Sequence, residues 1–252
     1  MMDREIVLSP DEAKAELLKR TRRGFLIGGV AAVASIGGYE WMKSRQDDDG
    51  IPHLERRVLN ANGRLAHSYL NDRHRMPTFS RADVRPLKAN GNIGVDHPVE
   101  DDWRLTVNTG HGPELDLGVA DVKALPRVDM ITRFCCIEGW DTVVQWGGAR
   151  FSDFTRKYFP PGHELPPYVS MMTPDEEYYV GLDLKSALHP QTLIAYEYNG
   201  SPLPPEHGAP LRLVIPVKYG IKNIKRIGTI QYTAKRPADY WADDGYDWFA
   251  GL

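Results

Sequence analysis

The sequence predicts an α+β fold built from mixed short strands, short helices and many loops. Glycine and proline are plentiful, at 23 and 19 of 252 residues, as in a domain with many turns. Short β-branched or alternating segments predict strands, and other segments predict helices. The two kinds do not alternate in the strand–helix–strand rhythm that builds a parallel α/β sheet.

The first 44 residues have the layout of an export signal. The motif Thr-Arg-Arg-Gly-Phe-Leu at residues 21–26 opens a weakly apolar run that extends from residue 24 to residue 39. A basic patch before a short hydrophobic stretch is typical of signal peptides, and the paired arginines resemble the twin-arginine signal of folded proteins. The run is shorter than the roughly 20 residues of a membrane-spanning helix. An uncleaved membrane anchor and a buried helix are the alternatives.

The sequence predicts three regions in order along the chain. Before the arginines, Ser-Pro-Asp-Glu at residues 9–12 forms a capping box with proline at the first helical position, which predicts a short helix to about Arg20. Residues 45–56, with three consecutive aspartates, predict a polar linker. Residues 57–252 are long enough for one domain with a sizeable core.

The first half of this domain contains few long periodic segments. Residues 54–70 predict a helix with a thin apolar face, and residues 76–94, rich in proline, arginine and asparagine, predict an irregular stretch. Residues 103–108 alternate like a strand. Residues 119–125 predict a short helix, and the β-branched residues 128–134 predict a strand that leads to the two cysteines.

The second half predicts mostly strands. A helix at residues 151–159 is stopped by two prolines, and a helical turn follows at residues 184–188. The segments that look extended are residues 168–172, 178–182, 192–198, 211–217 and 224–232.

The charge balance argues against a nucleic-acid-binding protein. The whole chain has a formal net charge of −3, and residues 45–252 carry 24 Lys and Arg against 28 Asp and Glu. A protein that binds nucleic acid usually carries a basic surplus on one face or along one helix. We therefore expect no nucleic-acid partner.

Cys135 and Cys136 are the only cysteines, and they are adjacent. Exported proteins usually pair their cysteines, but sequence neighbours fit poorly with the Cα separation that a disulfide prefers. We therefore expect at least one free thiol. A thiolate is a soft ligand for a redox metal, although two small buried hydrophobic residues are the alternative. The sequence has no C-x-x-C pair and no histidine near the cysteines, so a zinc site is poorly supported.

A second group of residues combines turns with positive charge. Arg212 lies on an expected strand between apolar residues, where a guanidinium is costly to bury without a partner. Its planar fork suits a phosphate or a carboxylate. Lys218, Lys222 and Lys225 lie around a glycine turn whose N–H groups suit an anion. A solvated basic loop is the alternative.

Three motifs together resemble the molybdopterin-binding domain of the sulfite oxidase superfamily. They are Phe-Cys-Cys-Ile-Glu-Gly-Trp at residues 134–140, Asn-Gly at 199–200 with His-Gly-x-Pro-x-Arg at 207–212, and Pro-x-Lys-Tyr-Gly-x-Lys-x-Ile-Lys at 216–225. The resemblance runs from about residue 57 through the aromatic tail. Within the superfamily, the first and third motifs are most similar to the periplasmic catalytic subunits that reduce methionine sulfoxide in proteins.

The resemblance implies a molybdenum–molybdopterin cofactor and assigns residues to it. Cys136 matches the cysteine whose thiolate binds molybdenum, and Cys135 is interpreted as a packing neighbour. Glu138 is expected to shape the substrate pocket, and Trp140 and Tyr219 to line its mouth. The expected cofactor contacts are Asn90 (with Asn92 as the rival), Thr173, His207, Arg212, Lys222, Asn223, Ile224 and Lys225.

Two departures from the family pattern bear on the substrate. Sulfite oxidases follow the ligand cysteine with Ala-Gly-Asn-Arg-Arg, whereas this chain has Glu138, whose carboxylate would repel sulfite. The sulfoxide-reducing branch tends to have asparagine where this chain has His207, and histidine there is common in sulfite oxidases. The first departure favours reduction of an oxide and the second favours sulfite oxidation.

These inferences predict an exported molybdopterin-dependent oxidoreductase that transfers an oxygen atom. The expected substrate is an S- or N-oxide, either a small molecule or protein-bound. Sulfite oxidation is one alternative, and a catalytically silent binding module of the same fold is another, against which the intact Cys136, Arg212 and Lys225 argue. No haem motif C-x-x-C-H is present, so we expect electrons from a separate partner such as a membrane haem protein. The expected location is the periplasm.

Overall fold

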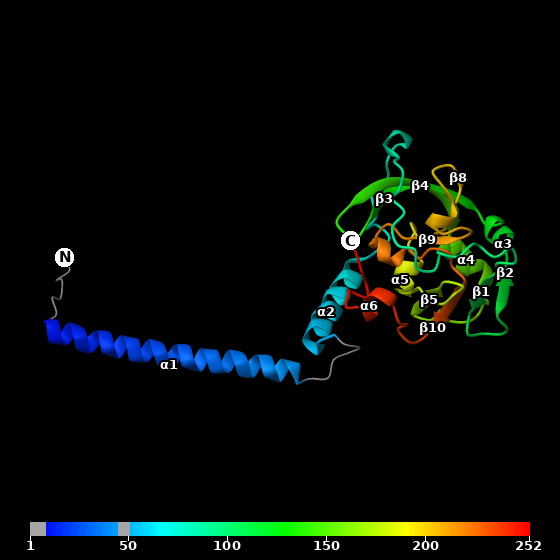
Figure 1. The fold of residues 1–252 in the computed structure, drawn as a ribbon. Helices are drawn as coiled ribbons and strands as arrows, with labels where there is room; N and C mark the ends of the chain where they lie inside the picture. The colour runs from blue at the N-terminus through cyan, green and yellow to red at the C-terminus, as the bar shows by residue number, and fades with distance from the viewer. Residues whose placement is uncertain (1–8, 45–50) are drawn as a thin grey trace. The chain divides into compact units, whose positions relative to one another are not determined.

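The computed structural model describes residues 9–44 and 51–252, and the chain divides into two compact units, residues 1–56 and residues 57–252. The smaller unit contains one long helix, α1, Pro10–Lys43 (Figure 1). The helix begins where the capping box predicted, but the predicted end near Arg20 is wrong. The apolar run contains no proline and is rich in alanine, so its glycines lower helix stability without ending the helix.

In the part of the chain that the structure describes, no helix combines the length and the apolar character of a membrane span. The first half of the predicted linker, residues 45–50, lies outside the described residues. Residues 53–56 of that predicted linker already belong to the next helix, α2, His53–Tyr69.

Among the described residues, the larger unit contains two sheets of five strands each (Figure 1). The first has the order β2-β1-β10-β5-β6, in which β1 and β10 are parallel and the other pairs are antiparallel. The second is antiparallel, with the order β3-β4-β7-β8, and β9 also pairs with β7. The strands are β1 Leu105–Asn108, β2 Leu115–Leu117, β3 Arg127–Cys135, β4 Asp141–Arg150, β5 Tyr168–Met172, β6 Tyr179–Asp183, β7 Leu193–Tyr198, β8 Ser201–Pro202, β9 Arg212–Val214 and β10 Thr229–Thr233.

Short helices connect these strands, and the α+β prediction is confirmed. The helices are α3 Val119–Lys123, α4 Phe151–Tyr158, α5 Leu184–Ala187 and α6 Tyr240–Asp243, and the 3-10 turns are η1 Arg81–Asp83, η2 Pro205–His207 and η3 Gly220–Lys222. The strand expected at residues 211–217 is limited to β9, and that expected at 224–232 begins only at Thr229. The longest strand, β4, was not predicted.

The main core contains residues of both sheets. It includes Leu105, Val169 and Ile230 from the first sheet and Ile194 from β7 of the second. Alternate residues of β7 belong to different clusters, since Leu193 packs into a second cluster. Because successive side chains of a strand point to opposite faces, both faces of β7 are buried. This double burial makes the second sheet a rigid support for the hairpin β3–β4.

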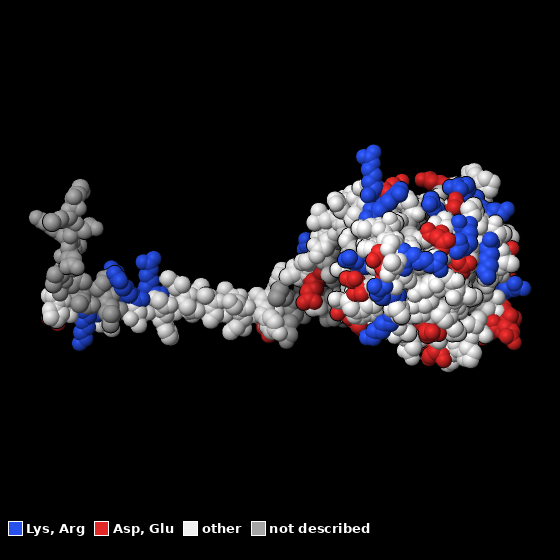
Figure 2. All heavy atoms as spheres, turned by 90° about the horizontal axis from the view of Figure 1, so that it is seen from above, with Lys and Arg blue, Asp and Glu red and all other residues white. Residues whose placement is uncertain are grey.

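Acidic and basic side chains are interspersed over the surface. Figure 2 shows this mixture on one face of the larger unit, where lysines and arginines lie among aspartates and glutamates. The β3–β4 hairpin carries one such group, in which Arg127 bonds to both Asp129 and Glu197 across the sheet. Exposed pairs of this kind contribute little to stability, about 0–1 kcal/mol each.

Candidate active site

Cys136 is the first residue of the turn that joins β3 to β4. The strands pair as far as Cys135 and Asp141, and the Cys136 N–H then donates to the Trp140 carbonyl at 2.9 Å. Gly139 has a φ of +86°, which glycine adopts without strain, and its N–H donates to the Cys136 carbonyl. The turn therefore holds Cys136 at the end of the longest strand pair. Both cysteines are free.

Cys136 lines a cavity of about 190 Å³. Seven of the ten residues that we expected at the site line this cavity, although they come from distant parts of the sequence. They are Asn90, Cys136, Glu138, His207, Arg212, Asn223 and Lys225. The rival candidate, Asn92, does not line it, and neither does Tyr219.

Asn90 connects two sides of the cavity. Its side-chain amide lies 3.8 Å from the Cys136 sulfur and also contributes to lowering the pKa of Glu138. Its backbone carbonyl accepts a hydrogen bond from Lys225 at 3.0 Å. One residue of the irregular segment 76–94 thus joins the cysteine turn to the cationic side.

Arg212 brings a buried positive charge to the cavity. Its side chain is 2% exposed, and its guanidinium donates to the carbonyls of His207 and Asn223 and lies 4.7 Å from the Trp146 ring centroid. Among the described residues, Arg212 has no ion pair with a carboxylate. Burial lowers its pKa to about 9, because water no longer stabilises the charge.

Lys225 and His207 lie near this guanidinium. Lys225 donates to the carbonyls of Asn90 and Gly91, and burial followed by repulsion from Arg212 lowers its pKa to about 8. His207 is 5% exposed and its Nδ1 has no hydrogen-bond partner. Burial, then Arg212 and Lys225, lower the pKa of His207 to about 4, so its imidazole is neutral at pH 7.

Glu138 lines the same cavity and is exposed to solvent. The Trp140 indole N–H donates to its carboxylate at 2.9 Å. This bond, a second from Asn90 and the charge of Lys88 hold its pKa below the usual range. The cavity therefore has a cationic end at Arg212 and an ionised carboxylate at its mouth.

The comparisons with known proteins agree with this geometry. The model of the family described as "Oxidoreductase molybdopterin binding domain" matches residues 92–241. The chain belongs to this family.

Two relatives and one solved structure describe the similarity further. Protein-methionine-sulfoxide reductase catalytic subunit MsrP of Campylobacter jejuni is 33% identical over 94% of this chain and 82% of that protein. A protein of Azospira oryzae, provisionally named protein-methionine-sulfoxide reductase subunit YedZ1, is 37% identical over 67% of this chain, which spans 64% of that protein. The sulfane dehydrogenase SoxCD of Paracoccus pantotrophus, at 17% identity and a TM-score of 0.50, covers 56% of this chain and 41% of its own and shares the fold.

The predicted resemblance to the sulfite oxidase superfamily is thereby confirmed, and the protein is a molybdenum-dependent oxidoreductase with a molybdenum–molybdopterin cofactor. The residues of the cavity fit such a group. Within residues 9–44 and 51–252, the cavity offers a buried guanidinium without a carboxylate partner, a second cation and an imidazole nitrogen without a hydrogen bond, and these groups suit an anionic, polar cofactor. Cys136 supplies a sulfur in the same cavity.

Asn223 shapes the cationic end through its hydrogen bonds. Its side-chain oxygen accepts from the Ile215 N–H at 2.8 Å, and its amide donates to the Tyr219 carbonyl. Its own carbonyl accepts from Arg212. Asn223 therefore closes the loop after β9 and fixes the guanidinium at the same time.

Three of the expected cofactor contacts do not line the cavity. Lys222 is fully buried and donates to Asp239 and to the Gly181 carbonyl. Ile224 belongs to the main core. Thr173 bonds within its own turn, to Asp175 at 2.6 Å. Lys222 and Ile224 therefore anchor the loop that carries Asn223 and Lys225 to the buried interior.

Sequence reasoning missed two other parts of the site. Trp241 and Tyr246 line the cavity from the aromatic tail, whose density of rings was the available signal. Asp239 binds Lys222 from 17 residues further along the chain, a separation that no local pattern reveals.

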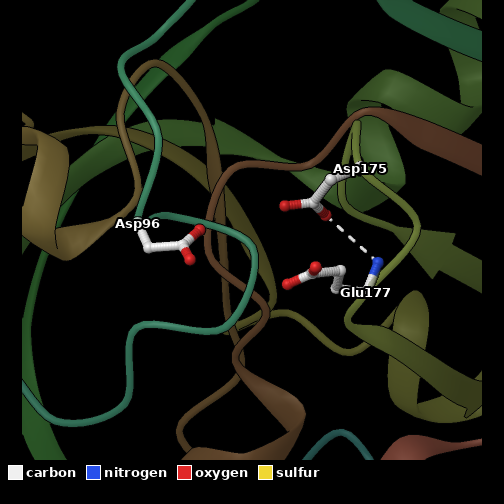
Figure 3. Close-up of side chains that lie close together, drawn as sticks. All are labelled: Asp96, Asp175 and Glu177. Carbon is white, nitrogen blue, oxygen red and sulfur yellow. Dashed lines mark hydrogen bonds between the residues drawn. The ribbon is translucent and has the colours of Figure 1, made fainter.

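One acidic group lies beside the turn that contains Thr173. Figure 3 shows the carboxylates of Asp96, Asp175 and Glu177, which come from two segments and face a common space. All three are exposed, and Asp175 accepts a hydrogen bond from the Glu177 N–H. Exposed carboxylates commonly lie together without an ion, so we assign no function to this group.

Proposed function

We propose that this protein is an exported enzyme that reduces an S- or N-oxide, with the Cys136 thiolate as a ligand of molybdenum. The reaction would convert a sulfoxide, two protons and two electrons into a sulfide and water. The observation that carries the proposal is the position of Cys136 in one cavity with a buried, carboxylate-free Arg212. The names of the relatives support a methionine-sulfoxide substrate.

The chain's own residues would hold the cofactor by its phosphate and by its pterin. Arg212 and Lys225 would bind its phosphate, and the neutral His207 and Asn90 would bind polar atoms of the pterin. The loop that carries Lys225 would be kept in place by Asn223, Ile224 and Lys222. Thr173 would position Gly94, which packs against its side chain. When bound, molybdenum held in this way supplies two-electron oxygen-atom transfer.

Asn90 would act on the thiolate itself. A charged sulfur in a partly closed cavity needs a hydrogen-bond donor, and the Asn90 amide is placed to donate to Cys136. The same amide also favours the ionised form of Glu138. Cys135, half-buried on the preceding strand, does not line the cavity.

Glu138 favours a neutral oxide over sulfite. Its lowered pKa keeps the carboxylate ionised at pH 7. An ionised carboxylate at this position would repel an anion such as sulfite as it approaches the cavity. A sulfoxide carries no net charge and escapes this repulsion. His207 remains the residue that the sulfite-oxidising alternative would explain better.

The arginine pair before the apolar run supports export through the twin-arginine route to the periplasm. Folded export suits a protein whose cofactor is inserted before transport. Because the chain has no haem motif, the electrons would come from a separate partner, and a membrane haem protein fits that role.

The proposal is tested with protein purified from a host that makes the cofactor. We expect about one molybdenum per chain, turnover of methyl sulfoxides with an artificial donor and little oxidation of sulfite. Cys136→Ser should abolish turnover, whereas the matched variant Cys135→Ser should retain metal and turnover. Full activity of Cys136→Ser, or sulfite oxidation without sulfoxide reduction, would contradict it.

A further inference from the structure

The mouth of the cavity exposes apolar side chains that the fold does not need for its core. Within residues 70–251, Ile137 at 36% and Tyr246 at 38% are the only two large hydrophobic side chains with exposures this high, and both line the cavity. Trp140 and Trp241, both half-buried, line it as well. Apolar groups gathered at one opening indicate a surface that contacts a ligand.

The structure fixes these rings in place. The Trp140 indole is held by Glu138, and the Trp241 and Tyr246 rings pack nearly perpendicular with centroids 5.2 Å apart. The Tyr246 N–H also donates to the Trp241 carbonyl at 2.8 Å. Asp239 caps the short helix α6 that carries Trp241. A rigid aromatic pair can contact a ligand without first being ordered.

The two ends of the cavity suit different groups. Arg212 and Lys225 form the cationic end, and Asn90 connects that end to Cys136 and Glu138. The wall contributed by Trp241 and Tyr246 has no charge. It would meet the carbon substituents of a substrate whose oxygen is directed to the metal that Cys136 would hold. Aromatic rings make favourable contacts with sulfur and with methylene groups.

We propose that Trp241 and Tyr246 are specificity-determining residues, which bind the apolar arm of a bulky sulfoxide and so favour a methionine sulfoxide side chain over dimethyl sulfoxide. This inference rests on the proposed function. An apolar contact of one or two methylene groups changes selectivity by roughly 10–200-fold, so a tenfold effect is a reasonable expectation.

The test compares two substrates in the cofactor-loaded enzyme. Tyr246→Ala should raise the KM for N-acetylmethionine sulfoxide amide about tenfold, with kcat and the constants for dimethyl sulfoxide within twofold of the unsubstituted protein. Tyr246→Phe should behave like the unsubstituted protein, because it keeps the ring. Trp241→Leu is a second variant. Tyr69→Ala is the matched control, since Tyr69 is 67% exposed and does not line the cavity.

Binding of the non-reducible N-acetylmethionine sulfone amide, measured by calorimetry, separates this inference from the proposed function. Weaker binding to Tyr246→Ala at unchanged molybdenum content supports the subsite, even if the unsubstituted enzyme reduces neither sulfoxide, in which case only the proposed function fails. The inference is overturned if the unsubstituted protein does not bind the sulfone. The inference is also overturned if Tyr246→Ala raises the KM for both sulfoxides equally or changes neither KM.

Discussion

Replacing Asp239 by alanine should strongly destabilise the protein, even without its cofactor. The Asp239 carboxylate is 1% exposed and accepts hydrogen bonds from Lys222, from the Gly181 N–H at 3.0 Å and from the Ala242 N–H at 3.2 Å. Removing one partner of a buried pair costs about 3–5 kcal/mol, and loss of a helix cap adds roughly 1 kcal/mol. For a domain of this size the expected fall in Tm is roughly 10–20 °C.

The assay is urea and thermal unfolding of the metal-free protein, followed by circular dichroism. Lys222→Met should cost a similar amount, because it leaves the carboxylate buried without its cation. Asp239→Ala combined with Lys222→Met should cost less than the sum by about 2–3 kcal/mol, since neither charge is then left alone. Burial already lowers the pKa of Lys222, and Asp239 counteracts that effect.

Three results would refute this reasoning. Additive effects of the two substitutions would show that the pair has no coupling energy. A loss of stability in Lys222→Met that appears only in the cofactor-loaded protein would show that Lys222 contacts the cofactor instead of supporting its loop. An Asp239→Ala change below about 1 kcal/mol would also contradict the expected cost of a buried unpaired charge.

Three further predictions concern single residues. The pKa of His207 is near 4 in the fold against about 6.5 in the unfolded chain. Between these values the unfolded chain binds more protons, so the free energy of unfolding should fall by roughly 2 kcal/mol as the pH is lowered from 7 to 5. Urea unfolding of the metal-free His207→Asn variant should not show this fall. Gly208→Ala should cost about 1–3 kcal/mol in urea unfolding, because its φ is +100° and the added Cβ would lie 2.7 Å from the Lys225 Cα. An unchanged midpoint would contradict that strain. Cys135→Ala should keep its metal, measured by mass spectrometry, and its free energy of unfolding should fall by about 1 kcal/mol or less. Loss of the metal would mean that the two thiols act together.

The fold was partly predictable from local patterns. The ends of short strands such as β5 and of the helix α2 agree with the sequence to within a residue or two. The strand β4 was missed because Gly147 and Gly148 lower the local strand propensity. Their reason is tertiary: a Cβ on Gly148 would lie 2.3 Å from the Ile194 carbonyl of β7. Such a close approach is invisible before the partner strand is known.

The residues of the candidate site were predictable from the sequence where they belong to a recognisable motif. Cys136, Arg212 and Lys225 belong to recognisable segments, and the structure brings them to one cavity. Lys222 was grouped with them because it is cationic and adjacent, although its ammonium points to Asp239. Alternate residues of an irregular loop can face the cavity or the core, and periodicity cannot decide between them.

The loop that carries Asn223 and Lys225 is completed by the last part of the chain. The Tyr219 N–H donates to the Ala250 carbonyl, Lys218 pairs with Gly251, and the Leu252 N–H donates to the Val217 carbonyl. Residues 217–219 are therefore synthesised before their backbone partners at residues 250–252. These bonds can form only after residues 250–252 have left the ribosome, so the loop reaches its final hydrogen-bonding pattern late in synthesis.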